Sequence, residues 1–239
     1  MVPLVVALAL AAPPPALDPQ RLPHLPLRGL VRQTGGAVEF QSLRGRAFGR
    51  LAGFQLAQPG IPHGVLLMRG RARYTVDLLE RRVRPARKST IEIPGGCRLG
   101  DESANAALFL CGRTLRTRSQ RGARVLVGPA GRVGHWAWGE FSPNGGRVLA
   151  EWSAECEIPV TFDLSVSKPK LVPLGGATVA AAPEIVPLGW LGDGKPVVRV
   201  LHGGCGTGRL AAGVYVFGAR RPQLLVKARG IAPYAMWGG

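Results

Sequence analysis

The chain has 239 residues, of which 46% are hydrophobic and only 19% are charged, and this balance excludes a disordered polyelectrolyte. No apolar run reaches the roughly 18–20 residues that span a bilayer, which excludes a polytopic membrane protein and predicts no transmembrane span. The 34 glycines and 21 prolines favour a turn-rich all-β fold, and 31 Lys and Arg against 14 Asp and Glu give a formal net charge of +17.

The positive charge is concentrated in the first half of the chain. Residues 28–124 carry 19 Lys and Arg against 6 Asp and Glu, and most of the basic residues are arginine. Such a surface is typical of proteins that bind nucleic acid or another polyanion. A coding sequence rich in G and C also favours arginine whatever the function, so a compositional origin is the alternative.

The N-terminus has features of an export leader. Residues 2–12 form an apolar stretch, and three prolines follow it. This stretch has the length of the hydrophobic region of a signal peptide and is too short for a membrane helix, and residues 9–11 offer a small-x-small cleavage site. The segment before it lacks Lys and Arg, so an ordinary buried N-terminal segment is the alternative. The Pro-rich residues 13–26 are predicted to form an extended linker.

The sequence predicts a succession of short strands for the rest of the chain. Runs rich in Val, Leu and aromatic residues alternate with Gly, Pro, Asp and Asn turns, and helical periodicity is scarce. The predicted strands include 64–68, 74–79, 107–111, 124–127, 147–152, 160–164, 197–201 and 214–217.

The four cysteines, Cys97, Cys111, Cys156 and Cys205, are predicted to form two disulfides, because an even count follows a leader-like segment. Cys97 and Cys111 flank a turn-like run at 101–105. If this run is a hairpin tip, the two cysteines face each other at about the 4.5–5.5 Å Cα separation that a disulfide needs. This pairing leaves Cys156 with Cys205. The alternative is four free thiols in a cytosolic protein.

An internal repeat is visible along the chain. Residues 141–149 align with 190–198 at an offset of 49, and 75–78 match 161–164 at an offset of 86, which is twice 43. A further copy, midway between residues 75–78 and 161–164, would place its third strand near 115–118. A unit of 43–49 residues with four short strands has the size of a β-propeller blade.

These units predict an all-β propeller of four to five four-stranded blades over residues 28–239, preceded by the leader and linker over residues 1–27. Residues 234–238 resemble 135–139, which open a blade, so the chain ends as another blade begins. Either N-terminal strands complete this last blade and close the ring, or the propeller is incomplete.

A family resemblance rests on the sequence Phe-Ser-Pro-Asn-Gly-Gly-Arg-Val-Leu at 141–149. It is similar to the F-S-P-D-G signature of the TolB-type (WD40-like) β-propeller repeats, with Asn144 in place of the usual Asp. The second copy keeps Asp193, Gly194 and Lys195. The resemblance is clear over about 135–230 and faint elsewhere. It implies an exported, non-catalytic scaffold that binds a protein or peptide partner through its loops or central channel.

The sequence predicts no catalytic, cofactor-binding or metal-binding residue. It lacks a His-Glu-x-x-His motif, a nucleophile elbow and a phosphate-binding loop, and no cysteine or histidine has the spacing of a zinc ligand. The five tryptophans are interpreted as blade-packing residues rather than as ligand platforms. A secreted hydrolase on a propeller scaffold is one alternative function, and it requires acid residues or a triad that converge in the channel.

The best candidate contact surface is the basic stretch that contains Arg113, Arg116, Arg118 and Arg121. Arg116 and Arg118 are two residues apart and would share one face of a strand. A solvated outer strand is the alternative. The sequence therefore predicts a non-catalytic interaction module outside the cytoplasm that binds an unknown protein or peptide. An arginine-rich binder of anionic polymers is the other alternative function.

Overall fold

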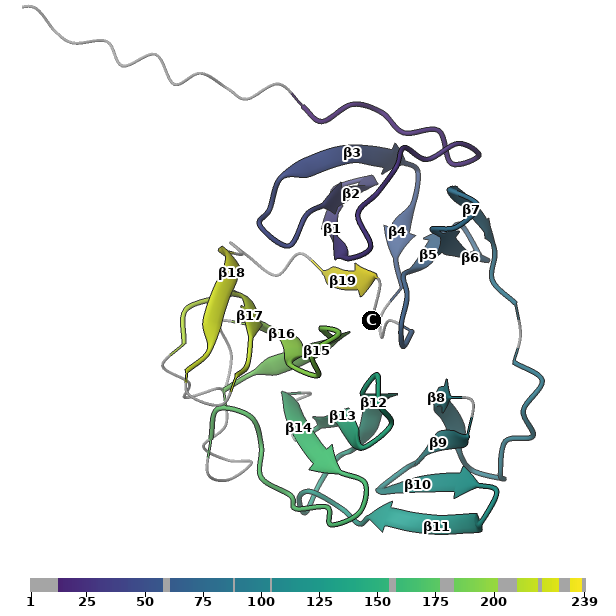
Figure 1. Ribbon diagram of the computed structural model, residues 1–239, viewed down its shortest axis with the longest axis vertical. Coiled ribbons are helices and arrows are strands. Elements are labelled where there is room, and N and C mark those ends of the chain that lie inside the picture. Colours follow the sequence, from purple (N-terminus) through teal and green to yellow (C-terminus); the bar gives the residue numbers. More distant parts are fainter. Residues whose placement is uncertain are drawn as a thin grey trace, which may run out of the picture.

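The structure is a computed structural model. It describes residues 13–239 apart from 58–60, 88, 104, 155–157, 177–182, 202–209, 219–220, 228–232 and 238–239. The described residues contain strands and turns but no helix, and they include no helix that could cross a membrane. The strands form five sheets in a ring (Figure 1), which confirms the all-β class and the upper limit of the predicted blade number.

Each sheet is one blade, and in each blade the strand named first lies nearest the centre of the ring. Blade 1 contains β19 (Tyr234–Trp237), β1 (Gly29–Thr34), β2 (Ala37–Gln41) and β3 (Ala47–Ala52). Blade 2 contains β4 (Gln55–Leu56), β5 (Leu66–Arg69), β6 (Ala72–Asp77) and β7 (Arg82–Pro85). Blade 3 contains β8 (Arg98–Ser103), β9 (Ala106–Cys111), β10 (Thr114–Ser119) and β11 (Gly122–Val127). Blade 4 contains β12 (His135–Phe141), β13 (Arg147–Ser153) and β14 (Pro159–Ser165), and blade 5 contains β15 (Ile185–Trp190), β16 (Pro196–Val200), β17 (Gly213–Val216) and β18 (Gln223–Lys227).

Blade 1 unites strands from the two ends of the sequence. β19 pairs antiparallel with β1, with Leu30 opposite Met236 and Val31 opposite Ala235. The resemblance between residues 234–238 and 135–139 reflects this arrangement, because β19 and β12 are both innermost strands. Of the two predicted alternatives, the structure therefore has the one in which an N-terminal strand joins the last blade.

Blade 4 departs from the four-stranded pattern in its described part. Its sheet has three strands, and the chain beyond β14 makes only an isolated bridge between Phe162 and Pro173. The Leu174 N–H donates to the Thr161 carbonyl at 2.8 Å, so this segment occupies the edge where a fourth strand would pair.

The repeat seen in the sequence corresponds to equivalent turns in blades 4 and 5. In the first copy, the Ser142 N–H donates to the Arg147 carbonyl and the Gly145 N–H to the Ser142 carbonyl. The second copy repeats this pattern 49 residues later, from Leu191 to Lys195 and from Gly194 to Leu191. Both turns join an innermost strand to its neighbour, and both place glycine in the left-handed region that such a turn requires.

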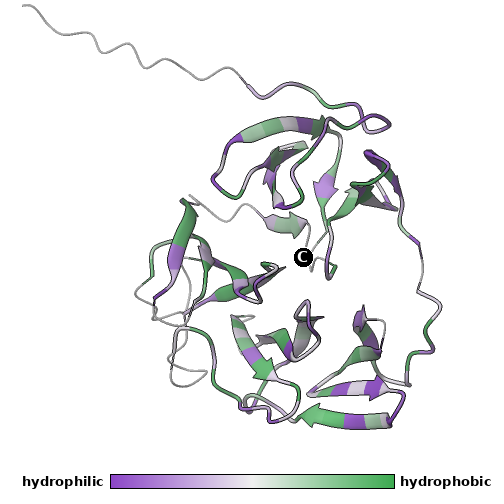
Figure 2. Cartoon of the chain, viewed as in Figure 1, coloured by the Kyte–Doolittle hydropathy of each residue, from purple (hydrophilic) through white to green (hydrophobic). Residues whose placement is uncertain are grey.

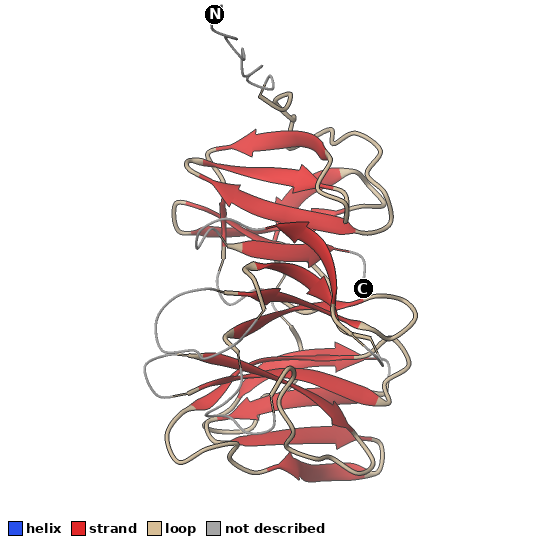
Figure 3. Cartoon of the chain, turned by 90° about the vertical axis from the view of Figure 1, so that its left-hand side faces the viewer, coloured by secondary structure: helices blue, strands red, loops and turns tan. Residues whose placement is uncertain are grey.

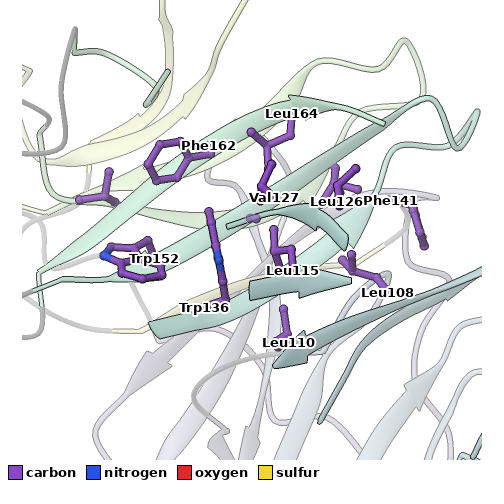
Figure 4. Close-up of a cluster of buried hydrophobic side chains, with 13 residues drawn as sticks. Leu108, Leu110, Leu115, Leu126, Val127, Trp136, Phe141, Trp152, Phe162 and Leu164 are labelled. Carbon is purple, nitrogen blue, oxygen red and sulfur yellow. The ribbon is translucent and has the colours of Figure 1, made fainter. Parts of the chain in front are cut away.

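The tryptophans pack between strands, as predicted. Trp136 lies with its ring 5.1 Å from that of Trp152 and 5.5 Å from that of Phe162, in edge-on contacts. Together with leucines of blade 3 such as Leu108, these side chains form one apolar cluster that joins blades 3 and 4 (Figure 4). Trp190 and Trp237 are also fully buried.

The Pro-rich segment before β1 lies along blades 1 and 2. The Leu17 N–H donates to the Arg50 carbonyl, and the Leu22 N–H donates to the Arg81 carbonyl. The Leu22 and Leu25 side chains are buried in the apolar cluster that joins blades 1 and 2. Part of the predicted linker therefore contributes to the core of the domain.

A disulfide joins Cys97, just before β8, to Cys111, at the end of β9. The pairing of Glu102 with Ala107 and of Ser103 with Ala106 shows that these strands form the predicted hairpin about residue 104. The other predicted pair, Cys156 with Cys205, lies outside the described residues.

The boundary between blades 2 and 3 differs from the other boundaries of the ring. Apolar clusters of described residues join blades 1 and 2, 3 and 4, 4 and 5, and 5 and 1. None of those clusters contains side chains from both blade 2 and blade 3. Polar contacts of a loop from blade 2 instead connect these two blades, and they form the first part of the candidate site.

Candidate functional site

One face of the ring carries the turns that follow the third strand of each blade and, in blades 2 to 5, the turns that join the first strand to the second. We call it the turn face. Consecutive strands in each sheet are antiparallel, so these two sets of turns lie on the same side of the ring (Figure 3). Neighbouring blades present these turns on the same side of the ring. Arg147 in blade 4, for example, donates to the Gly194 carbonyl in the equivalent turn of blade 5 at 3.0 Å.

A histidine and two carboxylates meet where the β4–β5 loop reaches the inner strands. His63 Nε2 lies 3.0 Å from Asp101 Oδ2 on β8, and His63 Nδ1 lies 3.4 Å from Glu140 Oε1 on β12. The His63 backbone N–H also donates to Glu140 Oε2 at 3.0 Å. His63 has a φ of 55°, which non-glycine residues rarely adopt. The contacts of this single residue therefore tie blade 2 to blades 3 and 4.

The two carboxylates of this cluster are buried, whereas the histidine is not. The side chains of Asp101 and Glu140 are 4% and 1% exposed, and that of His63 is 35% exposed. Asp101 Oδ2 also accepts the Phe141 N–H at 2.7 Å. Burial raises the pKa of Glu140 to about 7, against the opposing effect of His63. The pKa of His63 is raised by its hydrogen bond to Asp101 and by both carboxylates, which together outweigh its desolvation.

A glycine makes room for the buried carboxylate. Gly189 on β15 has a φ of 138°, and a Cβ atom there would lie 2.9 Å from Met236 Cε and 3.3 Å from Glu140 Oε1. The Glu140 carbonyl accepts the Nε1–H of Trp190 at 3.3 Å. Inner strands of blades 1, 4 and 5 therefore surround Glu140.

This cluster is the convergence of acid residues that a hydrolase on a propeller scaffold requires, and the sequence did not reveal it. A histidine between two carboxylates can hold and transfer a proton. Among the described residues, however, no hydroxyl or thiol is a hydrogen-bond partner of His63. Asp101 Oδ2 and Glu140 Oε2 have hydrogen-bond partners within the protein, whereas the buried Glu140 Oε1 has none among the described residues. The contacts of these three residues connect blade 2 to blades 3 and 4.

A second carboxylate with a raised pKa, that of the half-buried Glu151, lies on β13. Burial raises the pKa of Glu151 to about 7, and the nearby Arg98 opposes this rise. Arg98 Nη2 donates to the carbonyls of Trp136 and Ala137 at 3.1 and 2.6 Å. Glu151 lines a small, partly open cavity of about 20 Å³ together with Met236, other inner-strand residues and the β4–β5 loop, which is enough space for about one water molecule.

Basic residues recur in the outer turns of the turn face. In every blade, the chain that follows the third strand carries at least one exposed Lys or Arg before the fourth strand or the segment in its place. These residues are Arg44 and Arg46 in blade 1, Arg81 in blade 2, Arg121 in blade 3, Lys168 and Lys170 in blade 4, and Arg221 in blade 5. Glu80, which pairs with Arg82, is the acidic residue in these described segments.

Two pockets open between blades at this face. The larger, of about 460 Å³, lies between blades 3 and 4 and is lined by Arg121, Arg124 and Phe141 among others. The smaller, of about 350 Å³, lies between blades 4 and 5. Its Arg147 is paired with Asp163 and stacks over the Trp190 ring at 5.0 Å. The charges that line the larger pocket have no such acidic partner within it.

The four arginines predicted as a contact surface do not form one patch. Arg113 lies in the β9–β10 turn, on the opposite face, and donates to the carbonyls of Gly131 and Arg132 at 2.8 Å. Arg118 donates to the Glu92 carbonyl and lies over the Phe109 ring at 5.2 Å.

The other two predicted arginines are more accessible. Arg116 is exposed on β10, and its neighbours Leu115 and Thr117 are buried on the other side of the strand, so Arg116 and the half-buried Arg118 share one face as expected. Figure 2 shows the hydrophilic segments of β10 and β11 on this outer edge of blade 3. Arg121 belongs to the turn face and to the larger pocket.

Sequence reasoning missed His63, Asp101 and Glu140. One pattern could have indicated the carboxylates, because each is an acidic residue that directly follows a glycine in an innermost strand, as Gly100-Asp101 and Gly139-Glu140. His63 gives no such indication, since it lies in a loop outside the repeat.

Comparison with known proteins finds no matching family model and no matching curated protein. Solved structures to which the chain is similar include TolB from Acinetobacter baumannii, with 10% identity over 83% of this chain and a TM-score of 0.38. A putative TolB from Agrobacterium tumefaciens has 12% identity, covers 91% of this chain and 82% of its own, and has a TM-score of 0.41. A luciferin-regenerating enzyme has 12% identity over 87% of this chain and 80% of its own, with a TM-score of 0.38.

The chain spans about half the length of the Acinetobacter baumannii structure, since the match covers 52% of that protein. Two of these structures belong to the family that the motif at 141–149 resembles. At these identities and TM-scores the comparisons say nothing about function. The fold assignment rests on the sheet topology, which is that of a five-bladed β-propeller.

Proposed function

We propose that this chain is a non-catalytic binding module outside the cytoplasm, which holds an acidic protein or peptide segment on its turn face. The observation that carries the proposal is the recurrence of exposed Lys or Arg in the outer turns of all five blades on one side of the ring. A perimeter of one charge sign attracts and orients an oppositely charged partner. The two pockets on the same face offer places for side chains of that partner.

Two features support a location outside the cytoplasm. Disulfides persist in oxidising compartments and are rare in the cytosol, and Cys97 is joined to Cys111. The leader-like residues 2–12 precede the linker and the propeller domain, which we place at 28–239 and to whose core Leu22 and Leu25 of the linker add. We expect the protein isolated from a secreting host to begin after the apolar stretch, as measured by intact mass. A chain that begins at Met1 and carries Cys97 and Cys111 as free thiols would overturn the proposed location.

The turn face is tested by binding of a peptide of about ten glutamates to the full chain. Replacing Arg44 and Arg81 with Gln removes one charge from each of two blades and is expected to weaken binding at least tenfold at low salt, because screened attraction between exposed charges is lost. The matched control replaces Arg71 and Arg132, which lie on the opposite face, with Gln. Titration calorimetry in 50 and 300 mM salt measures both variants. Equal weakening by the two variants would contradict a specific face.

A second candidate function is the binding of an anionic polymer such as heparin or a nucleic acid. The basic perimeter favours it as well, because exposed charges suffice for contacts to phosphate or sulfate groups. The same two variants separate the candidates when heparin and a single-stranded oligonucleotide replace the peptide. Tighter binding of either polymer than of the peptide, lost only in the turn-face variant, would favour the second function.

A further inference from the structure

We propose that the pocket between blades 3 and 4 is a binding site for a small organic oxyanion, held by Arg121 and Arg124. The ligand class is a carboxylate or phosphate group attached to a compact apolar body. Because Arg121 also belongs to the turn face, this inference rests in part on the proposed function. It adds a defined small-molecule site to what is otherwise a broad charged surface.

Hydrogen-bond donors dominate the polar side of the pocket. Its lining includes Arg121 and Arg124 together with Thr117, Ser119 and Gln120. No Asp or Glu is among the described residues that line it. A guanidinium has five N–H donors in a planar fork that matches the two oxygens of a carboxylate or phosphate. A donor-rich pocket without acidic residues fits an anion and disfavours a cation.

Arg124 is held in place by blade 4. Its Nη2 donates to the Val166 carbonyl at 2.6 Å, so its guanidinium bridges the two blades that form the pocket. Arg121 lies at the tip of the β10–β11 turn, where its backbone N–H donates to Ser119 Oγ at 3.3 Å. The Arg124 side chain is thus already ordered before a ligand binds, which reduces the conformational entropy that is lost on binding. Arg121 is exposed and available to close over the ligand.

The other side of the pocket is apolar. Phe141 and Val166 of blade 4 and Ala106 and Ala123 of blade 3 contribute to the lining. Phe141 is only 2% exposed and belongs to the apolar cluster of blades 3 and 4, so this wall is rigid. The volume of about 460 Å³ lies within the range of roughly 300–1,000 Å³ that is usual for small-molecule sites. A ligand with one anionic end and one apolar end matches both walls.

The probes are phenylacetate and phenyl phosphate, with the neutral phenylacetamide as the reference of similar shape. Calorimetric titration of the full chain is expected to detect binding of at least one anion and at least tenfold weaker binding of the amide. The tighter binding of phenyl phosphate or of phenylacetate shows whether the natural ligand carries a phosphate or a carboxylate group. Equal affinity for all three compounds, or no binding of any, would overturn the proposal.

Three variants locate the site. Arg121→Gln and Arg124→Gln are each expected to weaken anion binding at least tenfold. Arg116→Gln is the matched control, because Arg116 is exposed on β10 but does not line the pocket, and it should leave anion affinity within twofold. Circular dichroism melting tests whether Arg124→Gln stays folded without its hydrogen bond to the Val166 carbonyl. Equal effects of Arg116→Gln and Arg121→Gln would refute the site.

The failure of this inference is distinguishable from that of the proposed function. If the glutamate peptide binds through Arg44 and Arg81 while the small anions do not bind, the turn face stands and the pocket site is wrong. If the small anions bind but the peptide does not, the pocket site stands without an acidic protein partner.

Discussion

The free energy of unfolding is expected to be several kcal/mol larger at pH 5 than at pH 8. Burial raises the pKa values of Glu140 and Glu151 from 4.5 to about 7. A raised pKa means that the folded chain keeps a proton that the unfolded chain releases, so the stability contributed below pH 4.5 is lost as the pH rises towards 7. At about 1.4 kcal/mol per pKa unit, each carboxyl group accounts for about 3 kcal/mol. The raised pKa of His63 acts in the same direction.

Urea unfolding between pH 5 and pH 8 measures this dependence, and two variants assign it. Glu151→Gln is expected to be close to the wild type at pH 5 and more stable than it at pH 8, because the amide does not ionise. Glu140→Gln should flatten the profile as well, although it removes the ion pair with His63. A wild-type profile that is flat or rises with pH would show that these carboxyl groups ionise freely in the folded protein.

Replacing Trp136 with Ala is expected to lower the free energy of unfolding by about 3–5 kcal/mol. Trp136 is 1% exposed, and its ring contacts those of Trp152 and Phe162 in the cluster that joins blades 3 and 4. Its Nε1–H donates to the Arg113 carbonyl at 3.2 Å, so the change also removes a hydrogen bond. Urea unfolding at a fixed pH measures the loss.

Two further variants control for this effect. Trp136→Phe retains most of the ring contacts and should cost markedly less than Trp136→Ala. Leu79→Ala removes an apolar side chain that is 96% exposed and should stay within about 0.5 kcal/mol of the wild type. A loss of less than about 1 kcal/mol in Trp136→Ala would mean that blades 3 and 4 do not depend on this cluster.

The sequence was sufficient for the architecture because the fold is repetitive. The turns after Phe141 and Trp190 have similar sequences and equivalent hydrogen bonds, and the number of residues between them gives the blade length directly. The hairpin between Cys97 and Cys111 could be predicted because strand pairing depends on local sequence.

The candidate site could not be predicted in the same way. His63, Asp101 and Glu140 come from three consecutive blades, and only the arrangement of these blades around the centre of the ring brings them together. Arg113 and Arg121 are close in sequence, but the strand between them places them on opposite faces. Proximity in the sequence is thus a poor guide to a shared surface when a β-strand separates the residues.

The boundary between blades 2 and 3 has a consequence for how the protein opens. In the described residues it lacks an apolar cluster of its own, whereas the other four boundaries each have one. In place of such a cluster, the polar contacts of His63 described above connect blades 2 and 3, so we expect the ring to behave energetically much like a linear array of five units whose two ends are these blades. In such an array each unit is stabilised by its neighbours, and terminal units open before internal ones. Backbone amides of the outer strands of these two blades should consequently exchange with solvent sooner than those of blades 1, 4 and 5.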